Sequence, residues 1–172
     1  MEKHIVNLDE IEPKPFSAPI PDHLKEKYEG VKLGFIAPLI GAQKLGYNLT
    51  IVPPGKRAFQ FHNHRVNEEL FFILAGEGEV RIGNETFKIR AGDLIAHPPG
   101  GPETAHQIVN TSNTELKYLS FSTKEGPEIC DYPDSKKFAI LHVEGTNPDG
   151  SPKQFRYVGK EDESLGYFDG EK

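Results

Sequence analysis

The stretch Phe61–Gly78, FHNHRVNEELFFILAGEG, places two histidines one residue apart, a pair of glutamates, and an apolar run that ends in a glycine turn. Side chains two residues apart on a β-strand lie on the same face, so His62 and His64 point the same way. After a short turn, an antiparallel return strand can place Glu69 against this pair. Two imidazoles and a carboxylate that converge in this way are ligands for a divalent first-row metal.

Short apolar segments separated by Gly and Pro turns continue on both sides of this stretch. Between residues 43 and 123 they succeed one another every eight to twelve residues, which is typical of an antiparallel β-barrel or jelly roll. Two further strands are predicted at 137–143 and 154–159, after a turn-rich loop at 124–135. The sequence therefore predicts an all-β fold with one barrel core.

Two arms flank the predicted core. The N-terminal arm, residues 1–42, is rich in proline and contains the one predicted helix, with Asp22 as its N-cap and Gly30 as its stop. The C-terminal arm, residues 124–172, ends in an acidic segment. At 172 residues the chain is predicted to form a single domain.

Composition narrows the possible partners and the compartment. The net charge of −6 disfavours binding to a phosphate backbone, so no nucleic acid is expected. No run approaches 18 consecutive apolar residues, so no membrane span is expected. Cys130 is the single cysteine and no apolar leader opens the chain, which favours the cytoplasm.

A later segment, GDLIAHPPGGPETAHQIVN at residues 92–110, offers a fourth ligand. His106 lies on a short apolar strand, and closure of a barrel can bring this strand beside the first pair of histidines. His97 precedes a proline at the end of another strand and is expected on the wall or rim of the site. Cys130 is expected in a loop, without a role in the chemistry.

At these residues the sequence resembles the cupin superfamily, in particular its small single-domain bacterial members. The first cupin motif corresponds to Gly55, His62, His64, Glu69 and Gly76, and the second to Gly92, Pro98, Gly100, His106 and Asn110. The spacer after the first glycine is one residue longer than usual, and five residues rather than two separate Gly100 from His106. The resemblance implies one divalent metal, Fe, Mn, Ni or Zn, held by His62, His64, Glu69 and His106.

The resemblance also implies a small-molecule substrate without naming the reaction. A metal-dependent dioxygenase is the first hypothesis, with Glu69 as the catalytic base. A sugar or sugar-phosphate isomerase or epimerase is the second, and a non-catalytic module that binds a small ligand is the third. The substrate pocket is predicted from residues that share a strand face with a ligand, namely Gln60, Phe71, Ile73 and Ile108.

The outer face of the same strands is also apolar. Leu70, Phe72 and Leu74 alternate with the inward residues, and Phe59 and Phe61 are expected beside them on the neighbouring strand. An exposed patch of this size exceeds what monomers usually tolerate, so either the arms or a second subunit must cover it. Cupins commonly pair barrel to barrel, which favours a homodimer.

Overall fold

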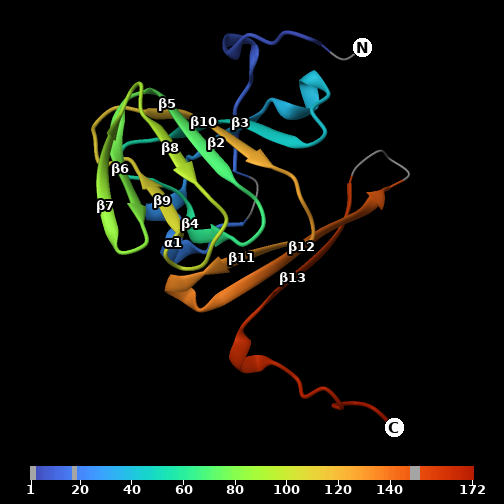
Figure 1. Cartoon of the computed structure of the whole chain (residues 1–172). Helices are drawn as coiled ribbons and strands as arrows, with labels where there is room; N and C mark the ends of the chain where they lie inside the picture. The colour runs from blue at the N-terminus through green and yellow to red at the C-terminus, as the bar shows by residue number, and fades with distance from the viewer. Residues whose placement is uncertain (1–2, 17–18, 148–151) are drawn as a thin grey trace.

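Two antiparallel β-sheets face each other across a shared apolar core in the computed structural model, which describes residues 3–16, 19–147 and 152–172 (Figure 1). The first sheet has the order β1 (Lys14–Pro15), β2 (Lys32–Phe35), β3 (Leu45–Val52), β10 (Leu116–Thr123), β5 (Glu69–Ala75) and β8 (Leu94–His97). The second has the order β13 (Pro152–Gly159), β12 (Lys137–Thr146), β11 (Glu128–Tyr132), β4 (Arg57–His64), β9 (His106–Val109), β6 (Glu77–Ile82) and β7 (Glu85–Arg90). The predicted antiparallel β fold is confirmed, although ladder hydrogen bonds do not close the two sheets into one barrel.

The described part of the chain has one α-helix, α1 (Asp22–Tyr28), and four short 3-10 helices at Leu8–Glu10, Ala37–Ile40, Pro133–Ser135 and Glu161–Glu163. Asp22 is the first helical residue and not the N-cap, because the extended residue Pro21 precedes it directly. Its carboxylate instead pairs with Lys25 at 2.7 Å. None of the helices among the described residues has the length and apolar character that crossing a membrane requires.

The core lies between the sheets because each strand contributes alternate apolar residues to it. The central buried cluster comprises Val31, Val52, Ala58, Phe71, Ile73, Val80, Ile89, Ile95, Ile108, Leu116 and Tyr118. The turn after β5 depends on Gly76, whose φ is +81° and whose hypothetical Cβ would collide with the backbone oxygen of Glu115. This glycine therefore lets β5 end tightly against the start of β10.

Strand β4 contains a bulge just before its histidines. Ala58 pairs with Ile108 and His62 pairs with His106. Between these two pairs β4 advances by four residues while β9 advances by only two. Phe59 takes up the difference with a φ of +60°. The bulge keeps Ala58 and His62 on the inner face and takes Phe59 and Gln60 out of the regular alternation.

The expected loop at 124–135 was wrong in part, because it contains strand β11. This strand pairs with β12 on one side and places Cys130 opposite His64 of β4 on the other. Its charged residues Glu128 and Asp131 concealed the strand in the sequence. Both are buried in the fold, where backbone N–H groups and Arg65 satisfy their carboxylates.

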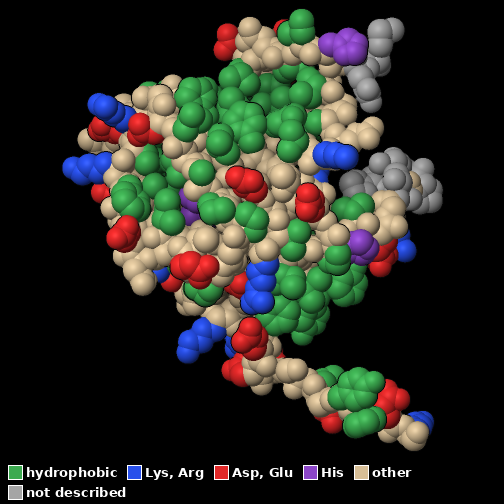
Figure 2. All heavy atoms as spheres, in the orientation of Figure 1, with side chains coloured by type: hydrophobic (Ala, Val, Ile, Leu, Met, Phe, Trp, Pro, Cys, Tyr) green, Lys and Arg blue, Asp and Glu red, His purple; other side chains and the backbone are tan. Residues whose placement is uncertain are grey.

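The N-terminal arm covers part of the outer face of the first sheet. Ile11 and Ile36 of the arm pack with Leu49 of β3, and Leu74 packs against this second cluster. Phe61 is buried, with the Arg81 guanidinium 3.6 Å from the centre of its ring. Hydrophobic side chains remain visible over β5, β10 and β3 in Figure 2, where the arm does not reach.

Candidate metal centre

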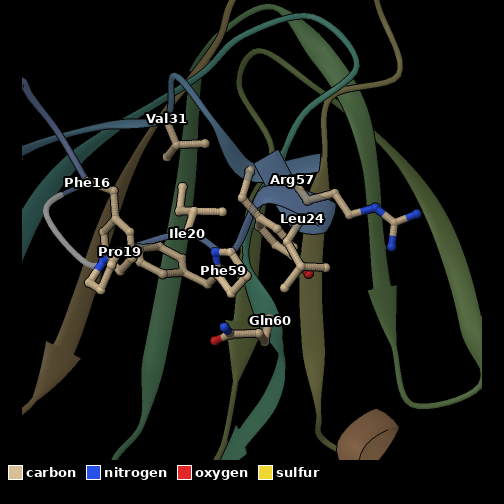
Figure 3. A pocket seen from close by; sticks show the side chains of 10 residues that line it. Phe16, Pro19, Ile20, Leu24, Val31, Arg57, Phe59 and Gln60 are labelled. Carbon is tan, nitrogen blue, oxygen red and sulfur yellow. The ribbon is translucent and has the colours of Figure 1, made fainter. Parts of the chain in front are cut away.

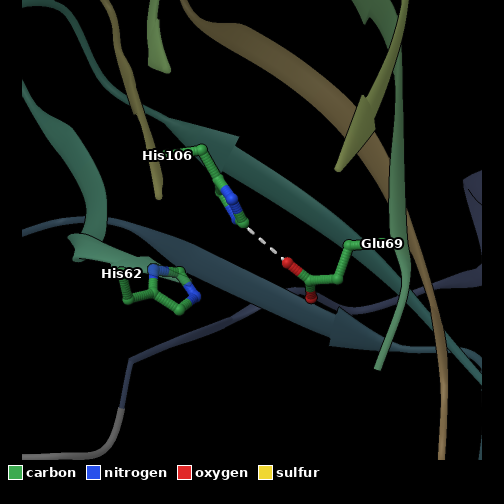
Figure 4. A group of neighbouring side chains, drawn as sticks. All are labelled: His62, Glu69 and His106. Atoms are coloured by element: carbon green, nitrogen blue, oxygen red, sulfur yellow. Dashed lines mark hydrogen bonds and ion pairs between the residues drawn. The ribbon is translucent and has the colours of Figure 1, made fainter. Parts of the chain in front are cut away.

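The four expected ligands lie together at one end of the space between the sheets. His62 and His64 end β4, His106 begins β9 and Glu69 begins β5, so the set draws on both sheets. Oε2 of Glu69 is 3.0 Å from Nε2 of His106 and 3.4 Å from Nε2 of His64. The ring of His62 lies 4.8 Å, centre to centre, from that of His106 (Figure 4).

Hydrogen bonds to backbone carbonyls determine which ring nitrogen of two of these histidines is free. Nδ1 of His62 lies 2.8 Å from the carbonyl of Gln60, and Nδ1 of His106 lies 3.3 Å from that of Thr104. A carbonyl only accepts, so each Nδ1 carries a proton and a neutral ring keeps a lone pair at Nε2. This is the usual support for a histidine that binds metal through Nε2.

The Nε2 atoms of His106 and His64 are placed where they could bind a cation. Nε2 of His106 points at the Glu69 carboxylate, and a lone pair beside a carboxylate is repelled unless a proton or a metal ion lies between them. Nε2 of His64 is buried without a hydrogen-bond partner. Two atoms that each lie about 2.1 Å from one ion are separated by about 3.0 to 3.4 Å at octahedral or tetrahedral angles. The two Nε2 distances to Glu69 fall in this range, so the residues present fit a divalent metal.

The charges at the centre follow from burial and from mutual contact. Burial would raise the pKa of Glu69, but the imidazoles of His106 and His64 hold that pKa well below its usual range. Burial, with His106 beside it, lowers the pKa of His62 to about 4. Burial also opposes protonation of His64, but the Cys130 thiol and the Glu69 carboxylate outweigh it and raise the pKa of His64 to about 11. An incoming metal must therefore displace a proton from His64.

His64 also belongs to a second cluster, in which its Nδ1 lies 3.4 Å from Sγ of Cys130 and 3.5 Å from Oε2 of Glu128. Glu128 is poorly suited to hold a metal there, because its lone pairs are already used. Oε1 accepts from the backbone N–H groups of Arg65, Val66 and Ile129, and Oε2 accepts from the backbone N–H and the side-chain amide of Asn67. The cluster is better explained as a support that orients His64, with its Nε2 toward Glu69.

Two side chains at the centre, Cys130 and Tyr132, were not assigned to it from the sequence, and a third, His97, was expected on its wall or rim. Cys130 contacts His64, the ring of Tyr132 stacks on His62 at 6.1 Å and 21°, and the ring of His97 stacks on His106 at 3.8 Å and 25°. Burial, followed by His106, lowers the pKa of His97 to about 3, so this ring is neutral. The two-residue spacing of Glu128, Cys130 and Tyr132 was the available signal for β11, since it is the spacing of one strand face.

The four residues predicted to line the substrate pocket lie in three different parts of the structure. The ring of Phe71 lies 4.8 Å from that of His97 and 5.5 Å from that of His106, so it adjoins the centre. Ile73 and Ile108 are buried within the central core cluster. Gln60 is exposed at the β4 bulge and lines a different, small apolar cavity of about 90 Å³ beneath α1 (Figure 3).

Comparison with known proteins agrees with this geometry. Residues 48–122 match the family model of the cupin domain. The chain is 37% identical over 83 residues to an uncharacterized protein of Methanocaldococcus jannaschii, and 35% identical over 69 residues to an oxalate-binding protein of Thermotoga maritima. These alignments cover 48% and 40% of this chain and 56% and 54% of the two relatives, so the chain spans about half of their length.

Solved structures share the fold over a longer range. A sugar phosphate isomerase of the cupin superfamily from Silicibacter pomeroyi superposes with a TM-score of 0.74, over 95% of this chain and 97% of that one. At 22% identity this likeness concerns the fold alone. The matched region runs through both halves of the centre, from His62 on β4 to His106 on β9, so residues 48–122 of this chain form a cupin domain.

Proposed function

We propose that this cupin is a metal-dependent enzyme that binds a small oxygenated acid at the centre formed by His62, His64, Glu69 and His106. The observation that carries the proposal is the approach of two Nε2 atoms to one oxygen of Glu69, at 3.0 and 3.4 Å. Three neutral imidazoles and one carboxylate suit Fe, Mn, Ni or Zn, and they leave coordination positions for a substrate.

The bound metal would act as a Lewis acid that polarises a substrate oxygen. The protein's own part is to hold the substrate beside the ligands and to move a proton. Glu69 is the proposed base, because the other nearby carboxylate, Glu128, is occupied by hydrogen bonds from the backbone. Phe71 would form an apolar wall that excludes water from one side of the centre.

The substrate class is proposed from the chemistry of the centre and from one relative. A carboxylate with a neighbouring oxygen can chelate a metal that has two open positions. The Thermotoga maritima protein, named for binding oxalate, aligns with 40% of this chain at 35% identity and supports a compact acid of this kind. The dioxygenase and isomerase hypotheses differ in their co-substrate, since only the first consumes O₂.

The test begins with protein purified without added metal and then loaded with Mn, Fe, Ni or Zn. We expect one ion per chain, oxalate binding that depends on the ion, and turnover of a small oxo or hydroxy acid. Uptake of O₂ would select the dioxygenase, whereas aldose to ketose exchange of a sugar phosphate would select the isomerase. Metal-loaded protein that binds no acid and turns over neither class would contradict the proposal.

We also propose a homodimer formed through the outer face of β5 and β8. Leu70 and Phe72 are half-buried there, and Leu94, the partner of Phe72 in the ladder, is 67% exposed.

We expect light scattering at micromolar concentration to give twice the 19.2 kDa chain mass. Leu94→Arg should yield monomer, because a charge cannot be buried there without a partner. The control Val143→Arg, at a 57% exposed position on β12, should leave the dimer intact. A wild-type mass of one chain at all concentrations would contradict the dimer.

A cytoplasmic location and a single domain over residues 1–172 remain part of the proposal. The buried thiol of Cys130 beside His64 is compatible with a reducing compartment. Strands from both arms extend the two sheets, β1 and β2 on the first and β11 to β13 on the second, which favours one cooperative unit.

A further inference from the structure

His97 is an exception to the rule that buried polar groups find partners. Among the described residues, five buried side-chain polar atoms have no hydrogen-bond partner, and both ring nitrogens of His97 are among them. The side chain is 3% exposed, so water does not satisfy these nitrogens from the surface. A buried donor or acceptor left unpaired costs about 1 to 3 kcal/mol. A second molecule that pairs with the ring would remove this cost.

The position of His97 identifies where that molecule would lie. His97 ends β8 directly opposite Glu69 of β5, and directly opposite residues of an antiparallel pair present their side chains on the same face. Its ring stacks on His106 with centres 3.8 Å apart, and Phe71 lies 4.8 Å away. The unpaired imidazole is therefore beside the metal centre and not in a remote part of the core.

His97 is not needed as a ligand of the ion, because His62, His64, Glu69 and His106 already supply four protein ligands. Its ring lies face to face on that of His106, with the two planes 25° apart. His97 is instead placed to reach a molecule bound next to His106, as a donor from one nitrogen or an acceptor at the other.

We propose that His97 binds the substrate, by donating a hydrogen bond to an oxygen of a compact carboxylic acid held at the metal centre. This inference rests on the proposed function and adds to it the residue that selects the acid. A buried polar group built to pair with a substrate oxygen discriminates strongly against molecules that lack it. The substrate should therefore carry at least one oxygen that does not bind the metal and can accept the hydrogen bond from His97.

The experiment measures oxalate binding by calorimetry to protein loaded with one manganese per chain. His97→Phe keeps a flat ring but removes both nitrogens, and we expect it to retain the manganese while binding oxalate about tenfold to a hundredfold more weakly. His97→Gln restores a donor and should recover part of the affinity. Ile95→Val, which shortens a core residue on the same strand and face, is the control and should bind oxalate as the wild type does.

The outcomes separate this inference from the proposed function. Wild-type protein that binds no manganese or no oxalate would contradict the proposed function itself. Unchanged oxalate affinity in a His97→Phe protein that holds its manganese would overturn only the role of His97. Loss of manganese from both His97 variants would also overturn it, because His97 would then support the metal and not the acid. If the His97→Phe protein does not fold, the His97→Gln protein decides the question. The glutamine amide is shorter than the imidazole and displaced from its place, so oxalate affinity should still be measurably weaker than in the wild type.

Discussion

Replacement of His62 and His64 together by alanine is expected to abolish stoichiometric metal binding while the fold persists. Removal of two of four ligands leaves Glu69 and His106, and two protein ligands do not hold a divalent ion against a chelator. Both side chains lie at the end of β4, outside the central core cluster, so their loss opens little of the core. Metal content after dialysis against chelator and the circular dichroism spectrum together measure this result.

The matched control removes two histidines that lie far from the centre. His23 on α1 and His142 on β12 are both exposed, so the double variant His23→Ala and His142→Ala should keep one metal per chain. If the His62 and His64 variant kept full occupancy after the same dialysis, the ion would lie elsewhere in the chain.

Glu128→Ala is expected to cost about 3 kcal/mol or more of the free energy of unfolding. The buried carboxylate accepts from the backbone N–H groups of Arg65, Val66, Asn67 and Ile129, and alanine would leave these donors unpaired. Hydrogen bonds to a charged acceptor contribute about 1.5 to 3 kcal/mol each, and losses within one network do not add fully. Denaturant unfolding of metal-free protein measures the change without any contribution from the ion.

The same variant should weaken metal binding, because three of these N–H groups, those of Arg65, Val66 and Asn67, belong to the turn between His64 and Glu69. Glu125→Ala is the control, since this exposed glutamate lies three residues earlier and its side chain makes no contact in the network. We expect it to change stability by less than about 0.5 kcal/mol. A Glu128→Ala protein as stable as the Glu125→Ala protein would show that the network does not hold the turn.

Only part of the proposed ligand set follows from local periodicity. The single residue between His62 and His64 fixes their common face. Glu69 does not reach them by the predicted antiparallel return, because β5 does not pair with β4 and Glu69 faces the histidines from the other sheet. No local rule pairs β9 with β4, so His106 was predicted from barrel closure and from the second cupin motif. The structure pairs His62 directly with His106.

Two features could not be predicted from periodicity. The bulge at Phe59 breaks the alternation on which the placement of Gln60 depended, and its positive φ is carried by a residue type that gives no warning of it. Strand β11 contains charged residues, which in a sequence are typical of a loop. Their burial depends on partners distant in sequence, such as Arg65, which donates to Asp131. The places of Cys130 and Tyr132 at the centre were missed for the same reason, since both depend on pairing between distant strands.

The most direct test of the metal centre is X-ray absorption at the zinc edge of protein loaded with one zinc per chain. A zinc ion held by three histidines and Glu69 should have nitrogen and oxygen neighbours at about 2.0 to 2.2 Å, outer-shell scattering from imidazole rings, and no sulfur neighbour. A sulfur neighbour at about 2.3 Å would contradict it, because the ion would then lie in the cluster of His64, Glu128 and Cys130 and not between His62, Glu69 and His106.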